Sequence, residues 1–229
     1  MGTESIAPVQ KIVGPGNAYV TAAKTLLRGM VEIDFPAGPS EIGIIADSTA
    51  VPDFVAADIL AQAEHDPNSA CVLVTTDESL VRRVEECMQA QIKSAPRKKI
   101  MLQALENSGY ILVRDIEEAV HTMDAIAPEH LSLQVADSLT VLNMVKNAGS
   151  IFVGPYAPVS CGDYASGTNH VLPTAGHAAS FSGLDVAHFQ KKSTVQIISR
   201  EGLENLSDII EIIAKAEGLN AHSEAVPEH

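Results

Sequence analysis

The chain has 229 residues, 46% of them hydrophobic, which is enough to bury the core of one large domain or of a domain with a smaller unit. A net charge of −14 argues against a nucleic-acid-binding protein, because phosphate neutralisation needs a basic face. No apolar run reaches about 18 residues, so we expect no membrane span. Three cysteines without paired spacing predict reduced thiols and a cytoplasmic protein.

Short apolar runs alternate with helical patterns along the chain. In chain order, we expect a strand at 42–46, a helix at 52–65, a strand at 71–74, a helix at 78–92, a strand at 110–113, a helix at 116–126, a strand at 131–135, a helix at 138–148, strands at 151–153 and 194–198, and a helix at 203–216. Gly43 weakens the first strand, because glycine is unfavourable inside strands.

Continuous apolar strands that alternate with helices indicate a mostly parallel sheet with helices on both faces. We therefore expect a doubly wound, Rossmann-like α/β fold, followed by a small C-terminal helical tail. Ligands of such sheets collect beyond the carboxyl ends of the strands. We expect Glu129, His130 and the segment around Asp163 to lie there.

The segment at residues 163–174 carries a carboxylate, hydroxyls, an amide and an imidazole among small residues, a composition suited to enclosing a small polar ligand. Asp163 is a candidate metal ligand, or alternatively the start of an Asx turn. Cys161 offers a thiolate ligand or simply a packing residue.

Two further polar clusters precede this segment. Gln62 and His65 are three residues apart on an expected helix, so they share a face and can bind one metal ion. The alternative for His65 is a helix C-terminal residue favoured by the helix dipole. Glu129 and His130 pair an acid with a base suited to proton transfer, or form a solvated loop pair.

Other signals are weaker. The turn at residues 14–17 resembles a phosphate-binding turn but lacks the third glycine of a dinucleotide fingerprint. Ser40 presents a hydroxyl to a ligand or belongs to an ordinary turn. His222 stands alone near the C-terminus, where an exposed histidine is the ordinary expectation.

Seven stretches in chain order resemble the histidinol dehydrogenase family. They are KIVGPGNAYVT at 11–21, PAGPSE at 36–41, QAEH at 62–65, PEHL at 128–131, GDYASGTNHVLPT at 162–174, FQK at 189–191 and EGLNAH at 217–222. This family oxidises L-histidinol to L-histidine through an aldehyde and uses two NAD⁺. The resemblance implies the same reaction here, within histidine biosynthesis.

The resemblance also implies roles for single residues. It implies one zinc per site, held by Gln62, His65, Asp163 and His222 and completed by the amine and imidazole nitrogens of the substrate. Glu129 and His130 would be catalytic. The implied substrate contacts are the four zinc ligands together with Ser40, His130, His170 and Glu217, and the implied NAD contact is Asn17.

Members of the family are about twice as long as this chain. We therefore expect a fragment, a split-gene half or a degenerate paralogue, whose regions are the remnant of a cofactor-side lobe (1–36), a Rossmann-like catalytic domain (37–186) and a tail that reaches a partner subunit (187–229). The resemblance implies a homodimer with shared active sites, with a separate N-terminal half as a further candidate partner. The alternatives are an inactive zinc- or histidinol-binding module with an incomplete NAD site and, without a His-Glu-x-x-His helix, a zinc hydrolase.

Overall fold

The computed structural model describes residues 2–16 and 18–226. Contacts divide the chain into two units, Met1–Phe189 and Gln190–His229, and each is described here by itself. The expected division at residues 36 and 186 stays a prediction. Within the described residues, no helix is both long and apolar enough to cross a membrane.

The centre of the first unit is a parallel sheet of five strands, in the order β5-β4-β3-β6-β7. The strands are β3 (Glu41–Ala46), β4 (Ala70–Thr75), β5 (Gly109–Leu112), β6 (His130–Gln134) and β7 (Ser150–Val153). From β3 the chain winds outward through β4 and β5, then returns to the other side of β3 for β6 and β7. The expected doubly wound α/β fold is confirmed.

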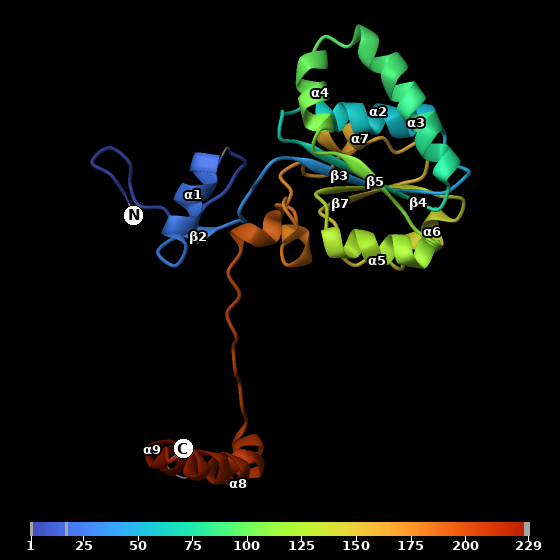
Figure 1. The fold of residues 1–229 in the computed structure, drawn as a ribbon. Helices are drawn as coiled ribbons and strands as arrows, with labels where there is room; N and C mark the ends of the chain where they lie inside the picture. Colours follow the sequence, from blue (N-terminus) through green and yellow to red (C-terminus); the bar gives the residue numbers. More distant parts are fainter. Residues whose placement is uncertain (1, 17, 227–229) are drawn as a thin grey trace. The chain divides into compact units, whose positions relative to one another are not determined.

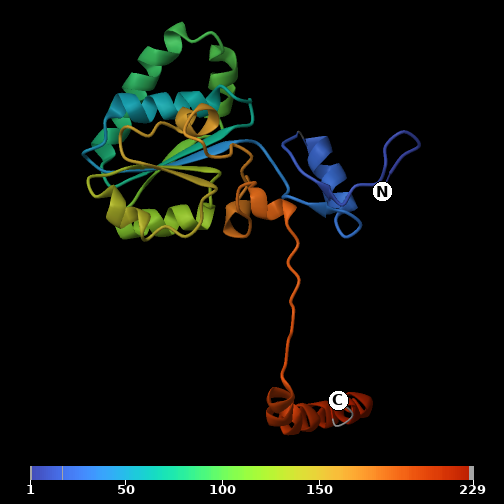
Figure 2. The ribbon, with the colours of Figure 1, turned by 180° about the vertical axis from the view of Figure 1, so that it is seen from behind.

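Helices cover both faces of this sheet. Figure 1 shows α2 (Pro52–Ala63), α3 (Glu78–Gln91), α4 (Lys98–Leu105) and α7 (Val159–Tyr164) on one face, and α5 (Ile116–Ile126) and α6 (Ser138–Leu142) on the other. Figure 2 shows the same layers from behind. Asp77, Asp115 and Asp137 each begin a helix by accepting a backbone N–H from its first turn. A separate apolar core fills each side of the sheet.

Gly43 lies in the central strand for a packing reason. A Cβ atom at this position would lie 2.2 Å from the sulfur of Met123 in α5 and 3.0 Å from the ring of Pro128. The missing side chain thus lets α5, and the loop that leads to Glu129, lie directly against β3. The glycine that weakened the sequence pattern is what brings this loop close to the sheet.

Two expectations about secondary structure are wrong. The helix expected at 138–148 ends at Leu142, because the carboxylate of Asp124 captures the backbone N–H groups of Lys146 (2.9 Å) and Asn147 (3.0 Å) and holds that segment out of a helix. The strand expected at 194–198 is not formed, since these exposed residues have no neighbouring strand among those described.

Smaller elements complete the two units. The N-terminal segment forms β1 (Lys11–Ile12), α1 (Ala18–Leu27) and β2 (Glu32–Ile33), with β1 parallel to β2. A short 3-10 turn follows α3 at Ile92–Ser94, and two more lie near the end of the first unit, at His177–Ala179 and Val186–Phe189. The second unit contains α8 (Arg200–Ala216) and α9 (Asn220–Ala225), where a helix over 203–216 was expected.

Candidate active site

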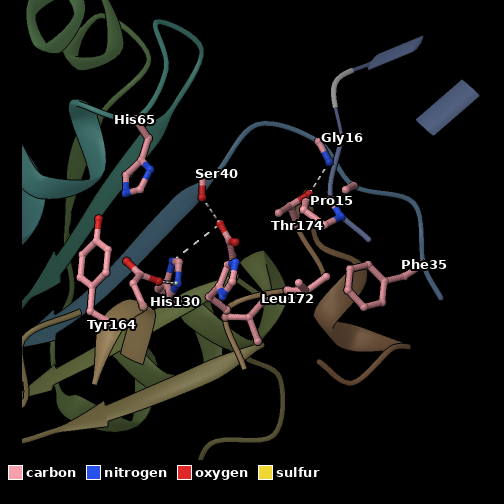
Figure 3. A pocket seen from close by; sticks show the side chains of 15 residues that line it. Pro15, Gly16, Phe35, Ser40, His65, His130, Tyr164, Leu172 and Thr174 are labelled. Atoms are coloured by element: carbon pink, nitrogen blue, oxygen red, sulfur yellow. Dashed lines mark hydrogen bonds and ion pairs between the residues drawn. The ribbon is translucent and has the colours of Figure 1, made fainter. Parts of the chain in front are cut away.

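A cavity of about 560 Å³ gathers most of the predicted site residues. Its wall includes Ser40, His65, Glu129, His130, Asp163 and His170. Figure 3 shows His65, His130 and Tyr164 on one side of the cavity and Pro15, Gly16 and Phe35 on the other. Residues separated by more than a hundred positions in the sequence thus share one polar wall.

The cavity lies at the amino ends of the strands, so the expected location at the carboxyl ends is wrong. Ser40 immediately precedes β3, and His130 is the first residue of β6, where it pairs with Ile42. His65 follows α2, on the way into β4. In most doubly wound sheets the functional residues lie in strand-to-helix loops at the carboxyl ends of the strands. Here His65 and Glu129 lie instead in short helix-to-strand connections, which are at the amino ends.

Glu129 is a buried carboxylate held in one orientation. The hydroxyl of Ser40 and the backbone N–H of Glu41, the latter at 3.0 Å, both donate to its Oε2 atom. Burial raises the pKa of Glu129 to about 7, although these two hydrogen bonds oppose the rise. A carboxyl group with a pKa near neutrality suits general base catalysis.

His130 lies between two carboxylates without a hydrogen bond to either. Its Nδ1 atom is 3.6 Å from Oε2 of Glu129, and its Nε2 atom is 3.8 Å from Oδ1 of Asp163. Both ring nitrogens are buried and lack a hydrogen-bond partner among the described residues. Burial lowers the pKa of His130, although Asp163 opposes this, so the ring favours the neutral form that can accept a proton.

Gln62 supports the predicted metal site. Its side chain is 1% exposed, and neither its oxygen nor its nitrogen has a hydrogen-bond partner in the part of the chain that the structure describes. An unsatisfied buried amide costs about 1–3 kcal/mol, so an unassigned partner is expected. A cation bound by the amide oxygen, together with His65 and Asp163 of the same unit, would satisfy the oxygen, while the amide nitrogen would still need an acceptor.

The described residues contain no group of three His, Cys, Asp or Glu side chains that would hold a metal by itself. The predicted zinc set has only His65 and Asp163 of these residue types in the first unit, and it adds the amide of Gln62 and a His222 that is expected from a partner subunit. Glu217 ends α8 and His222 lies in α9, both in the second unit, so their roles stay predictions. Asn17 lies outside the described residues.

Asp163 belongs to α7 rather than to an Asx turn. The helix starts where the buried carboxylate of Asp58 accepts the backbone N–H of Val159, at 3.3 Å. Gly162 lets this helix lie close to the sheet, since a Cβ atom at this position would come within 2.7 Å of the ring of Phe152. Since Asp58 and Gln62 are on the same helix, α2, this contact connects the segments that carry two of the predicted metal ligands.

Several wall residues were not assigned roles from the sequence. Tyr164, Leu172 and Thr174 line the cavity, and Thr174 accepts a hydrogen bond from the backbone N–H of Gly38 through its hydroxyl oxygen. These three lie within the segment 163–174, whose composition predicted ligand binding. Phe35 also lines the cavity, and nothing in its sequence surroundings indicated this.

Comparison with known proteins shows the family to which the chain belongs. The family model described as histidinol dehydrogenase matches residues 1–228. The chain belongs to the histidinol dehydrogenase family. Histidinol dehydrogenases of Methanosarcina mazei and Methanocaldococcus jannaschii are 52% and 53% identical to it, and each alignment covers 98% of this chain and 52% of the relative. A crystal structure of histidinol dehydrogenase from Elizabethkingia anophelis has a TM-score of 0.95 at 46% identity and covers 98% of this chain and 52% of that one.

The family resemblance seen in the sequence is therefore confirmed. The chain spans about half the length of the curated histidinol dehydrogenases that it matches.

Proposed function

We propose that this chain carries the acid–base centre of a zinc- and NAD-dependent histidinol dehydrogenase, which oxidises L-histidinol to L-histidine in two steps. The observation that carries the proposal is the buried pair of Glu129 and His130. One is a carboxylate with a pKa raised to about 7, and the other is an imidazole with both nitrogens unpaired beside it. Oxidation of the alcohol needs a group that accepts the hydroxyl proton, and oxidation of the aldehyde also needs a base that activates water; His130 and Glu129 suit these two roles.

The residues present fit a zinc ion. Gln62, His65 and Asp163 would hold it from the first unit, and His222 would be the fourth protein ligand. When bound, zinc supplies a positive centre that fixes the amine and imidazole nitrogens of histidinol and so orients the reacting carbon. The unsatisfied amide of Gln62 supports this assignment independently of the family resemblance.

In the first oxidation, a hydride leaves the alcohol carbon for NAD⁺ and the hydroxyl proton must leave with it. His130 accepts that proton, since burial favours its neutral form and leaves a ring nitrogen available. The products are the aldehyde, NADH and a proton held on His130. The carboxylate of Asp163, 3.8 Å from Nε2, stabilises the imidazolium that forms.

In the second oxidation, water must add to the aldehyde before another hydride can leave. Once His130 has released the first proton to solvent, Glu129 takes a proton from that water as its oxygen attacks the carbonyl carbon. The resulting hydrate would lose its hydride to a second NAD⁺, and the neutral His130 accepts the hydroxyl proton. The hydroxyl of Ser40 and the backbone N–H of Glu41 hold the carboxylate of Glu129 in position for this step. Ser40 and His170 would also contact the substrate.

The remaining parts of the site are assigned by analogy with the family. Glu217 and His222 would enter the site from a partner subunit of a homodimer, and Asn17 would contact NAD. Because the chain spans about half the length of its relatives, further NAD contacts would come from the other half.

Separate measurement of the two oxidations tests the proposal. We expect Glu129→Gln to slow histidinal oxidation by about 10²–10⁴-fold, the usual contribution of a general base, and to slow histidinol oxidation much less. Glu86→Gln, which changes an exposed carboxylate on α3, is the matched control. NADH formation would be followed with the purified chain, alone and with a supplied complementary half. Equal losses in both oxidations would contradict the assigned role of Glu129.

The second candidate is a zinc- or histidinol-binding module without turnover. Calorimetry would show tight histidinol binding, and no NADH would form even after the complementary half is added. Turnover under those conditions excludes this candidate.

A further inference from the structure

The turn at residues 14–16 lies on the side of the cavity opposite His65 and His130. Pro15 and Gly16 line the cavity there, beside the ring of Phe35 (Figure 3). The other side carries His65 and His130, the side chains assigned to the metal and to proton transfer. Pro15, Gly16 and Phe35 have no assigned role in metal binding or proton transfer, so their side of the cavity is available to a hydride acceptor.

A buried ion pair holds this turn. The ammonium group of Lys24 on α1 and the carboxylate of Asp34 after β2 are in contact, and their side chains are 4% and 0% exposed. The backbone N–H of Gly14 donates to Oδ2 of Asp34 at 2.7 Å, and Lys24 donates to the carbonyl oxygen of Gly14 at 3.0 Å. Both backbone polar groups of Gly14 are thus bound by the two members of one ion pair.

The remaining contacts orient the pair. Oδ1 of Asp34 also accepts the backbone N–H of Phe35 at 2.7 Å, and the ammonium group of Lys24 lies 5.9 Å from the centre of the Phe35 ring. Gly14 has a φ of 123°, which L side chains rarely adopt, so only glycine takes this conformation without strain. The pair therefore fixes the one residue whose backbone sets the direction of the turn.

Burial of two charges is not explained by stability alone. Desolvation of an ion pair commonly cancels its attraction, and apolar residues of similar size often replace such a pair without loss of stability. A buried pair that also binds specific backbone groups instead selects one backbone conformation. Here the selected conformation is that of a cavity wall.

We propose that Lys24 and Asp34 are positioning residues that hold the turn at residues 14–16 as the surface on which the nicotinamide cofactor binds. This inference rests on the proposed function, because it names the cofactor of that reaction. The pair acts through Gly14, and among the described residues it forms no hydrogen bond or ion pair with Gln62, His65 or Asp163. Its loss should therefore weaken binding of the dinucleotide and leave binding of the amino alcohol unchanged.

The decisive variant is the double substitution Lys24→Met and Asp34→Leu. It fills the same space with apolar side chains, but it frees both backbone polar groups of Gly14 and the backbone N–H of Phe35. Asp34→Asn is a milder second variant, which keeps one acceptor oxygen and removes the charge. Arg83→Gln, which removes an exposed ion pair with Asp77, is the matched control.

Three quantities would be measured for each protein, supplied with the complementary half: the Kd of NADH by fluorescence titration, the Kd of histidinol by calorimetry with zinc present, and the melting temperature. We expect the double variant to bind NADH at least about tenfold more weakly, and histidinol within about twofold of the parent. Its melting temperature should stay within a few degrees. Asp34→Asn should show a smaller loss of NADH affinity, and Arg83→Gln none.

Each other outcome counts against the inference. Unchanged NADH affinity in a folded double variant overturns the positioning role. Parallel losses of NADH affinity, histidinol affinity and melting temperature in both Asp34 variants show that the pair serves only folding, which also overturns it. If the parent itself binds no NADH, the proposed function fails first, and the inference fails with it.

Discussion

Replacement of the buried carboxylate Glu129 should stabilise the folded chain at alkaline pH. Glu129→Gln keeps the shape of the side chain, and its amide oxygen can still accept the hydrogen bonds from Ser40 and from the backbone N–H of Glu41. The change removes the desolvated charge and exchanges the other carboxylate oxygen for an amide NH2 group. A residue proposed as a catalytic base would then lower the stability of the fold that contains it.

The magnitude follows from the pKa of Glu129. Burial raises this pKa from its ordinary value of 4.5 to about 7, so the folded state retains a proton that the unfolded chain has already released. The destabilisation is absent below pH 4.5, grows as the pH rises towards 7, and is constant above that. At about 1.4 kcal/mol per pH unit it reaches the order of 3 kcal/mol at pH 8.

Urea denaturation at pH 5 and pH 8, followed by circular dichroism, measures this difference. A chelator should be present, because a bound cation would favour the charged carboxylate and reduce the effect. We expect Glu129→Gln to exceed the parent in free energy of unfolding by about 2–3 kcal/mol more at pH 8 than at pH 5. Glu86→Gln should show no such pH dependence. A variant that is less stable than the parent by the same amount at both pH values would refute the reasoning.

Three further predictions concern packing, metal binding and assembly. Gly43→Ala should destabilise the fold by about 1–3 kcal/mol in urea denaturation, because the new methyl group overlaps the side chains packed against β3. Gly109→Ala, with open space around the glycine, is the control and should change the stability little. Similar effects of the two changes would contradict the packing argument. Gln62→Ala should reduce zinc retained after dialysis, whereas Glu86→Gln should not, and full retention in the Gln62 variant would remove the amide from the proposed ligand set. Mixed dimers of Gln62→Ala and His222→Ala chains should regain activity if sites are shared, and no recovery in a verified heterodimer would count against sharing.

The pattern of apolar residues was sufficient to predict the sheet and most of its helices. The inner strands β3, β4 and β6 are largely buried by helices with an apolar side, so local periodicity and tertiary packing favour the same structure there, whereas the edge strand β5 is exposed. The failures occur where a distant group decides the outcome. The segment after Leu142 has helical periodicity, but Asp124 binds its backbone N–H groups. The apolar run at 194–198 has the composition of a strand but no neighbour to pair with.

For the candidate site too, the sequence predicts some features and the tertiary structure decides others. The sequence by itself determined which chemical groups are available, because motifs such as PEHL and GDYASGTNHVLPT place acids, bases and candidate metal ligands at fixed positions in the chain. Only the tertiary structure decided that they meet at the amino ends of the strands, and that burial changes how Glu129 and His130 hold protons. Desolvation and contact depend on what the fold places around a group, and residues distant in sequence supply those surroundings.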